Sequence, residues 1–216
     1  MKHIKRQAAP VTWPIERKGN KFVVTPLGPI KEGIPVLILL RDVLKVAENK
    51  KEVKRAIKNQ KVLLNKSKIR DVRNTAKLFD VISMPSSKKY YRVVLTHNGK
   101  FTLEEIKEKE SNTKITKVTG KTMLKGKKIQ LNLHDGRNIF QKIKCKTGDS
   151  VLVNLKDKKI EDTLKLEKGS EIRIFAGKHA GKKGKIQEID KENQIVNIKT
   201  EEGKINVLIK QVIVIK

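Results

Sequence analysis

The stretch Asn49-Lys50-Lys51-Glu52-Val53-Lys54-Arg55-Ala56-Ile57-Lys58-Asn59-Gln60 has the spacing of an amphipathic helix. At about 100° per residue, Val53, Ala56 and Ile57 share one face. The opposite face holds four cations, namely Lys51, Lys54, Arg55 and Lys58. Asn49 and Glu52 have the spacing of a capping box, which places the start of the helix. The cations repel one another across each turn, so the face is either simply solvated or the docking side for a polyanion.

The residues on either side extend this helix into a helix–helix–hairpin module over 35–84. Residues 35–47 predict the first helix, with Pro35 in its first turn and Arg41 and Lys45 one turn apart on its polar side. Residues 61–64 and 78–82 predict two strands, and Asn65-Lys66-Ser67 predicts a turn that contains no glycine. The turn and the connection after it add four cations, which are Lys66, Lys68, Arg70 and Arg73.

Residues 1–34 precede this module and show little periodicity. Four prolines and the only tryptophan, Trp13, are interspersed with Lys2, Lys5, Arg6, Arg17, Lys18 and Lys21. This composition predicts a basic extended N-terminal arm that becomes ordered along a phosphate backbone, or else a disordered tail whose charge aids solubility. Trp13 could stack on a base. Packing of Trp13 against the first domain is the preferred interpretation.

The rest of the chain predicts two β-rich parts, a small central barrel-like domain over 85–167 and a second β unit over 168–216. With the helix pair, the expected fold class of the whole chain is α+β, in several domains. The dipeptides Asn98-Gly99 and Asp135-Gly136 predict hairpin turns, and 129–133 alternates as a strand does. Residues 102–109 open with the spacing of a capping box, which predicts one short helix. In the last part, strands are expected near 172–174, 185–189, 195–198, 205–209 and 212–215. The loop 176–184 combines three glycines with Lys178, His179, Lys182 and Lys183, which suits close approach to phosphates.

Charge restricts the function further. The chain has 51 basic and 23 acidic residues, a net charge of +28, and each of the four parts has a surplus of cations. Such a surplus favours an anionic partner that touches much of the surface, most simply nucleic acid. With 8 aromatic residues in all, phosphate contacts should outweigh base stacking. The longest apolar run, 35–40, is too short to cross a bilayer, and no secretory signal is evident, so a cytoplasmic protein without a membrane partner is expected.

The residues that carry chemistry in enzymes are sparse. The four histidines and Cys145 have no metal-ligand spacing, so neither a metal site nor a cofactor is expected. Lys144 and Lys146 could lower the pKa of Cys145, but a packed strand cysteine is the preferred interpretation. No phosphate-binding loop of nucleotide hydrolases is found, and Asp135 is better explained by its turn. The sequence therefore predicts neither an enzyme nor a small-molecule substrate.

Several of these segments, in this order, resemble one family over nearly the whole chain. The module over 35–84 is similar to the small RNA-binding module of ribosomal small-subunit protein four, and 169–189 is similar to a KOW motif. The segments 3–24, 40–44, Met84-Pro85 and 133–138 resemble the e-type small-subunit ribosomal protein four of archaea and eukaryotes. The resemblance implies a structural protein of the small ribosomal subunit with an SH3-like KOW barrel at 168–216. Its partners would be ribosomal RNA and neighbouring ribosomal proteins.

The same resemblance would place RNA contacts on the cationic side of the helix pair, here Arg41, Lys54, Arg55 and Lys58. Together with the arm, the connection and the glycine loop, these form the predicted RNA-binding set. Two alternatives remain open: an RNA-modifying enzyme anchored by the helix pair, and a transcription elongation factor that meets a polymerase through the KOW unit.

Overall fold

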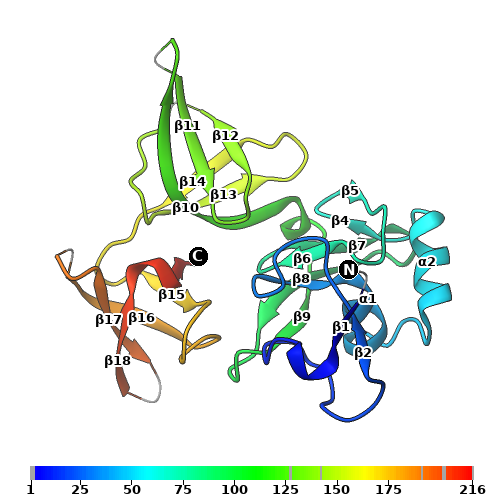
Figure 1. Cartoon of the computed structure of the whole chain (residues 1–216). Coiled ribbons are helices and arrows are strands. Elements are labelled where there is room, and N and C mark those ends of the chain that lie inside the picture. The colour runs from blue at the N-terminus through cyan, green and yellow to red at the C-terminus, as the bar shows by residue number, and fades with distance from the viewer. Residues whose placement is uncertain (1–2, 127, 142, 191, 201–202, 216) are drawn as a thin grey trace. The chain divides into compact units, whose positions relative to one another are not determined.

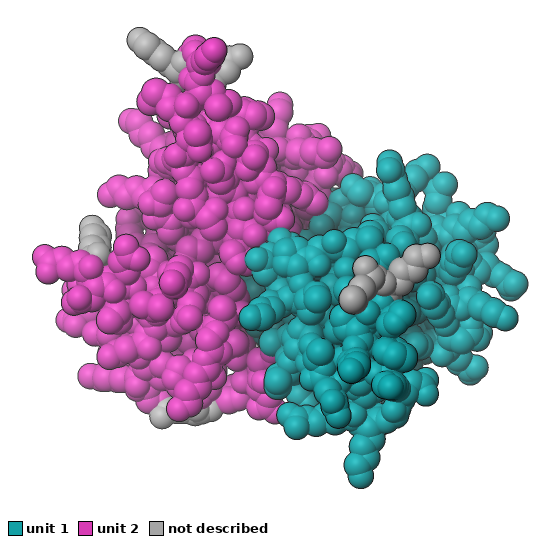
Figure 2. All heavy atoms as spheres, in the orientation of Figure 1, with its two compact units in different colours: residues 1–96, 100–112 teal, residues 97–99, 113–216 magenta. Residues whose placement is uncertain are grey.

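The computed structural model describes residues 3–126, 128–141, 143–190, 192–200 and 203–215. Within them the chain is mostly β, with few helices and several small sheets (Figure 1). It divides into two compact units, Met1–Thr96 with Lys100–Asn112, and His97–Gly99 with Thr113–Lys216 (Figure 2). The expectation of abundant β structure in several small sheets is confirmed, but helices are fewer than predicted. The sheets that the described residues form do not close into barrels.

The first unit contains one five-stranded antiparallel sheet, in the order β5-β4-β7-β8-β9, and two two-stranded ribbons, β1-β2 and β3-β6. Its strands are β1 (His3–Lys5), β2 (Phe22–Val24), β3 (Gly33–Pro35), β4 (Leu63–Leu64), β5 (Ser67–Lys68), β6 (Thr75–Lys77), β7 (Val81–Met84), β8 (Lys89–Leu95) and β9 (Phe101–Ile106). The strand β7, which ends the predicted helix–helix–hairpin module, pairs onward with β8, so the sheet continues past residue 84.

The predicted helix over 35–47 forms only in part. The α-helical segment α1 (Val36–Ile38) passes into a π-helical turn, Leu39–Val43, and Lys45 then adopts a left-handed φ of 53° that ends the helix. All residues from 36 to 40 are buried, so this segment lies in the core rather than at the surface. The second predicted helix is present as α2 (Lys50–Lys58). None of the helices within the described residues is both long and apolar enough to span a membrane.

The short helix predicted over 102–109 is wrong. Residues 101–106 form β9, which pairs along its length with β8, from Leu95 opposite Phe101 to Tyr90 opposite Ile106. The predicted turn at Asn98-Gly99 does form, with Gly99 at a φ of 71°. After this turn the chain reverses, so β9 runs antiparallel to β8. Cross-strand pairing therefore outweighs the local capping signal. The helical character is confined to a 3-10 turn at Glu110–Asn112.

The described part of the N-terminal segment packs onto the first unit. β1 pairs with β2, and Trp13 is 2% exposed, with its Nε1 donating to the Gly33 carbonyl at 3.1 Å. The backbone N–H of Phe101 donates to the Thr12 carbonyl at 2.8 Å. Packing of Trp13 against the first domain is thus confirmed. Gly33 is required beside it, because a Cβ there would lie 2.7 Å from the Ala76 carbonyl oxygen.

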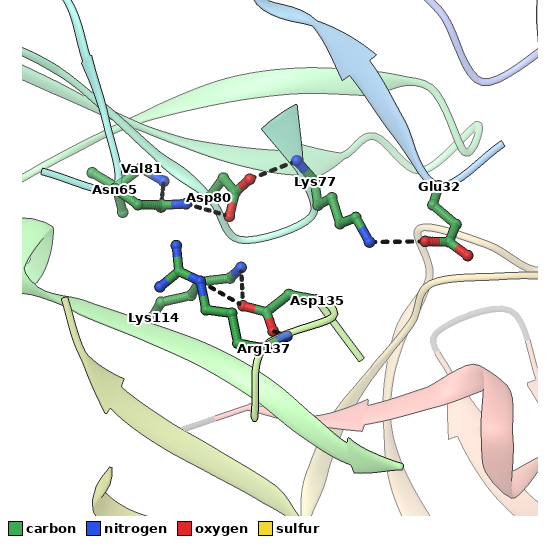
Figure 3. A network of polar contacts seen from close by, with 8 residues as sticks. All are labelled: Glu32, Asn65, Lys77, Asp80, Val81, Lys114, Asp135 and Arg137. Carbon is green, nitrogen blue, oxygen red and sulfur yellow. Dashed lines mark hydrogen bonds and ion pairs between the residues drawn. The ribbon is translucent and has the colours of Figure 1, made fainter. Parts of the chain in front are cut away.

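The glycine-free turn between β4 and β5 is stabilised by a buried asparagine. Asn65 and Lys66 both have left-handed φ values, 51° and 60°, which is the geometry of a two-residue hairpin. The Asn65 side chain accepts from the Val81 N–H at 2.9 Å and donates to the Asp80 carboxylate at 2.8 Å. The other Asp80 oxygen accepts from the Lys77 N–H at 2.7 Å (Figure 3). These bonds hold the turn in a conformation that glycine would otherwise be expected to supply.

The second unit contains two five-stranded antiparallel sheets, ordered β12-β11-β10-β13-β14 and β18-β17-β16-β15-β19. Their strands are β10 (Thr113–Leu124), β11 (Lys128–Leu133), β12 (Asn138–Phe140), β13 (Ser150–Asn154), β14 (Ile160–Leu164), β15 (Glu171–Ile174), β16 (Lys183–Asp190), β17 (Ile195–Thr200), β18 (Gly203–Leu208) and β19 (Val212–Val214). Strand β11 and the five strands β15 to β19 match predicted strands, whereas β10, β12 and β14 were not predicted. Asp135-Gly136 lies in the predicted turn between β11 and β12. Each sheet has its own apolar cluster, one around Leu131 and Val151 and the other around Ile172 and Val196.

Two buried lysines on β10 organise the second unit. Lys114 is 2% exposed, and its Nζ donates to the Asp135 carboxylate at 2.9 Å (Figure 3). Burial raises the pKa of Asp135, but Lys114 and Arg137 together hold it below its ordinary value. Lys117 is 3% exposed, and its Nζ donates to the backbone carbonyls of Ile209 and Val212. Lys117 thereby links β10, in one sheet of this unit, to the 3-10 turn Ile209–Gln211 and to β19, which belongs to the other sheet.

The buried asparagine in the β4–β5 turn gives a stability prediction. We expect Asn65→Gly to lower the free energy of unfolding by about 1–3 kcal/mol, because the Val81 N–H and an Asp80 oxygen lose their partner. Asn65→Ala should cost roughly 1 kcal/mol more, since alanine also tolerates the left-handed φ poorly. Urea unfolding of the wild type, Asn65→Gly and Asn65→Ala measures both losses in the free energy of unfolding. Equal stability of Asn65→Gly and the wild type would show that the side-chain bonds contribute nothing.

The buried Lys117 gives a pH prediction. Burial lowers its pKa from 10.5 to about 8, so between these values the unfolded chain binds more protons than the folded chain. The contribution of Lys117 to stability therefore rises as the pH rises through this window. Urea unfolding across the window should show a smaller rise for Lys117→Met than for the wild type. The exposed Lys168→Met is the control and should keep the wild-type rise. Parallel profiles for wild type and Lys117→Met would contradict this assignment.

Candidate RNA interface

The helix α2 forms as its sequence predicts. The Asn49 side chain accepts from the Glu52 N–H at 3.0 Å, and the Glu52 carboxylate accepts from the Glu48 N–H at 2.8 Å. Both side chains of the predicted capping pair thus accept hydrogen bonds. In a standard capping box the Glu52 carboxylate would accept from the N–H of Asn49, whereas here it accepts from the N–H of Glu48. Val53 and Ile57 are buried at 0% and 6% exposure and fix the rotation of the helix. Its other face therefore presents the four predicted cations, which are exposed.

A hollow of about 810 Å³ runs between α2 and the connection that follows β5. We call it the basic groove, and its apolar residues are Ile57, Ile69 and Val72. Six cations line it: Lys50, Lys54 and Lys58 from α2, and Lys68, Arg70 and Arg73 from residues 68–73. Among the described residues that line the groove there is one carboxylate, Asp71, and it accepts from the Arg73 N–H at 3.0 Å. The groove is therefore suited to a chain of phosphates.

A second hollow lies between the N-terminal segment and the first helix. We call it the arm hollow, and its volume is also about 810 Å³. It brings together four predicted cations, Arg6, Lys18, Arg41 and Lys45, with three carboxylates, Glu16, Asp42 and Glu48. The exposed ring of Phe22 also lines it. Its charge is thus more mixed than that of the basic groove.

Four predicted RNA contacts also make bonds within the protein. Arg6 donates to the carbonyls of Asn20 and Glu16 at 2.7 and 2.6 Å, which holds the loop between β1 and β2. Arg41 forms a two-point ion pair with Asp42 at 2.8 and 2.9 Å, and the hydrogen bond to Asp42 raises the pKa of Arg41. The remaining two are Lys66, whose Nζ donates to Ser111 Oγ at 3.0 Å, and Arg73, whose Nε donates to the Thr25 carbonyl at 3.1 Å. These four side chains position their segments as well as adding charge.

The other predicted cations of the first unit are exposed. Lys5, Arg17 and Lys21 lie on or beside the β1–β2 ribbon, and Lys51 and Arg55 lie on the open side of α2. Lys2 lies outside the described residues. Sequence reasoning missed Lys50 as a groove residue, although Lys50, Lys54 and Lys58 follow one another at four-residue intervals. It also missed Phe22, whose neighbours in the sequence give no sign that it is exposed.

The glycine loop of the second unit has the predicted turns. Gly177 and Gly181 have left-handed φ values of 88° and 94°, and the Gly181 N–H donates to the Ile174 carbonyl at 2.7 Å. Lys178 and Lys183 are exposed, whereas His179 and Lys182 are half-buried. Gly184 serves packing rather than ligand approach, because a Cβ there would lie 2.6 Å from the Lys199 carbonyl oxygen. The loop thus presents two exposed cations on a fixed backbone.

The groups that could carry catalysis are not assembled. Within the described residues, no three His, Cys, Asp or Glu side chains gather as a metal site would require. Cys145 is 5% exposed, and burial raises the pKa of its thiol, so the cysteine is packed as predicted. It lies in the connection between β12 and β13, however, and not on a strand. The Asp135 carboxylate accepts from the Arg137 N–H at 3.1 Å, so it stabilises the turn between β11 and β12, as predicted. The described residues define a β-rich protein with clustered surface cations.

Comparisons with known proteins agree with this class. Three family models match the chain: the RS4NT (NUC023) domain over residues 1–29, the ribosomal family S4e over residues 87–160 and the KOW motif over residues 168–199. The small ribosomal subunit protein eS4 of Methanocella arvoryzae is 43% identical over 190 residues, covering 87% of this chain and 80% of the relative. The protein of the same name from Methanosphaera stadtmanae is 40% identical over 221 residues, covering 99% and 92%.

A solved structure is also similar. The crystal structure of the 30S ribosomal protein S4e from Thermoplasma acidophilum superposes with a TM-score of 0.73 at 28% sequence identity, covering 86% of this chain and 95% of that one. The chain therefore belongs to the ribosomal S4e family. Membership of this family confirms the resemblance seen in the sequence. It also confirms that the chain is a structural protein rather than an enzyme.

The basic groove leads to a prediction about salt. In the free protein its cations repel one another, by about 0.2–0.5 kcal/mol for each pair one helical turn apart. We define the groove variant as Lys54→Gln, Lys58→Gln and Arg70→Gln together. At low salt it should be more stable than the wild type towards urea, and added NaCl should raise its stability less. The matched variant, with Lys31, Lys107 and Lys109 changed to Gln, loses the same charge from exposed sites elsewhere in the unit. It should gain about as much from salt as the wild type, whereas equal gains in all three proteins would argue against clustered repulsion.

Proposed function

We propose that this protein is a structural constituent of the small ribosomal subunit and that it binds ribosomal RNA there. Family membership supports the first part, since relatives along nearly the whole chain carry the name small ribosomal subunit protein eS4. One observation carries the second part. Six cations from two separate segments line one groove, whose described residues include a single carboxylate.

The basic groove is the centre of the proposed RNA interface. The α2 side contributes Lys54 and Lys58, which are exposed. The facing side contributes Lys68, at the end of β5, and Arg70 of the connection that follows, which are also exposed. Because these side chains need no acidic partner within the groove, phosphates can neutralise them without breaking a described ion pair. The apolar residues beneath them hold both segments in place, so little ordering is needed on binding.

The remaining predicted cations extend this interface. In the first unit they are Lys5, Arg17, Lys18, Lys21, Lys45, Lys51 and Arg55, which are exposed. In the second unit they are Lys178 and Lys183 of the glycine loop. Arg6, Arg41, Lys66 and Arg73 would act mainly by fixing the segments that carry the others. Lys182 and His179 would contribute less, since both are half-buried.

The predicted division into four functional parts belongs to the same proposal. It comprises an arm over 1–34, a helix–helix–hairpin module over 35–84, a central β domain over 85–167 and a KOW β unit over 168–216, whose described strands form an open sheet. The extents of the three family matches, 1–29, 87–160 and 168–199, support three of these parts. Within the subunit, neighbouring ribosomal proteins would be further partners, and the protein would be located in the cytoplasm as part of the ribosome.

Affinity for small-subunit ribosomal RNA tests the proposal. The groove variant should bind an RNA transcript of the small subunit more weakly than the wild type at physiological salt. Its slope of log K against log salt should be shallower by about 2–3, since each phosphate contact contributes roughly 0.7–0.9. The matched variant should retain a slope closer to that of the wild type. Equal slopes and affinities for the groove and matched variants would locate the RNA elsewhere on the protein.

A further inference from the structure

The β1–β2 ribbon has two different faces. Its register places Ile4 opposite Val23, and Val23 is 7% exposed, so this pair faces the protein. The alternate pairs, His3 opposite Val24 and Lys5 opposite Phe22, share the outward face because side chains alternate along a strand. Phe22 is 50% exposed there. An aromatic ring at this exposure contributes little to the core.

The ring of Phe22 is held in place by its neighbours. The His3 ring contacts it edge-on, with centroids 4.7 Å apart and planes inclined by 67°. The Lys21 Nζ lies 5.7 Å from the ring centroid, and Lys5 is directly across the ribbon. The outward face of the ribbon is formed by these neutral and basic side chains and carries no carboxylate among its described residues.

The ring also borders the arm hollow, where Lys18 and Lys45 are exposed. The hollow has the size of sites that hold small organic molecules. Of its three carboxylates, Asp42 is already paired with Arg41 at 2.8 Å, whereas Glu16 and Glu48 are exposed. The cations nearest the ring are therefore Lys5 across the ribbon and Lys21 beside it. Proteins that bind unpaired nucleic acid combine this arrangement, an exposed aromatic ring for the base with cations beside it for the backbone.

We infer that Phe22 and the arm hollow form a subsite for one unpaired nucleotide of RNA. The base stacks on the free part of the Phe22 ring, and Lys5, Lys18 and Lys21 neutralise the phosphates on either side. This inference deepens the proposed function and rests on it. It differs from the basic groove in kind, since the groove contacts backbone charge and this subsite recognises that a base is unpaired.

Two RNA probes and one matched pair of variants test the subsite in the full-length protein. The probes are a nine-nucleotide oligoadenylate and a twelve-base-pair RNA duplex without unpaired nucleotides. Phe22→Leu keeps an apolar side chain on the ribbon but removes the ring. Val11→Ala is the control, because Val11 is also an exposed apolar residue of the first unit, at 76%. Circular dichroism and thermal unfolding verify that both variants fold.

Phe22→Leu should weaken binding of the oligoadenylate by roughly 5-fold or more, as expected when one stacked base loses its aromatic partner. Its affinity for the duplex should not change, and its salt slope for the oligoadenylate should equal that of the wild type, because stacking releases no counterions. Val11→Ala should bind both probes as the wild type does. Phe22→Tyr, which keeps an aromatic ring, should bind the oligoadenylate more tightly than Phe22→Leu does. In Phe22→Trp, the added indole fluorescence should be quenched by the oligoadenylate.

Wild-type affinity of Phe22→Leu for the oligoadenylate, or equal losses on both probes, would overturn the subsite. So would unquenched indole fluorescence in Phe22→Trp. Failure of the proposed function has a different signature. In that case the wild type itself would bind the small-subunit transcript no more tightly than the matched and groove variants, whatever residue occupies position 22.

Discussion

Repulsion between like charges is the constraint on which this structure depends. Small apolar cores must hold together a folded chain of 216 residues with a net charge of +28. The structure does so by anchoring each basic segment from beneath. Val53 and Ile57 fix α2, Ile69 and Val72 fix the facing connection, and Trp13 and Val23 fix the N-terminal segment. The exposed cations are thus placed close together in the free protein. Under the proposed function, the repulsion between them would become binding free energy when phosphates neutralise them.

The buried polar groups serve the same end. Asn65 and Asp80 hold the hairpin from which the basic connection departs, and Arg73 bonds the end of that connection to the Thr25 carbonyl. In the second unit, Lys114 and Lys117 are buried cations with partners inside the protein, an Asp135 carboxylate and two backbone carbonyls. The surplus of basic residues is therefore of two kinds. Some cations are structural and satisfied internally, and others face outward for a partner to neutralise.

Local patterns predicted the strands of the last sheet, several strands elsewhere and the whole of α2, because alternation, turn dipeptides and a capping pair act over a few residues. The predictions that failed concern segments whose structure depends on contacts with distant parts of the chain. Residues 101–106 pair with β8 instead of forming the helix that the capping-box spacing at Thr102 predicted. The helix expected over 35–47 ends before Lys45, which has a left-handed φ. The predicted cations were largely found at the surface, but their charge alone could not separate Lys54, which is exposed, from Arg6 or Lys66, which bond within the protein. Nor could it show that Lys50 joins the groove or that Phe22 remains exposed.

The most direct test is the reactivity of individual lysines towards an amine-acetylating reagent, in the free protein and in isolated small ribosomal subunits. Mass spectrometry then quantifies acetylation at each position. Lys54, Lys58 and Lys68 should react readily in the free protein and be protected in the subunit. Equal reactivity of these three lysines in both states would mean that they face solvent in the assembled particle, and it would contradict the view that RNA neutralises them.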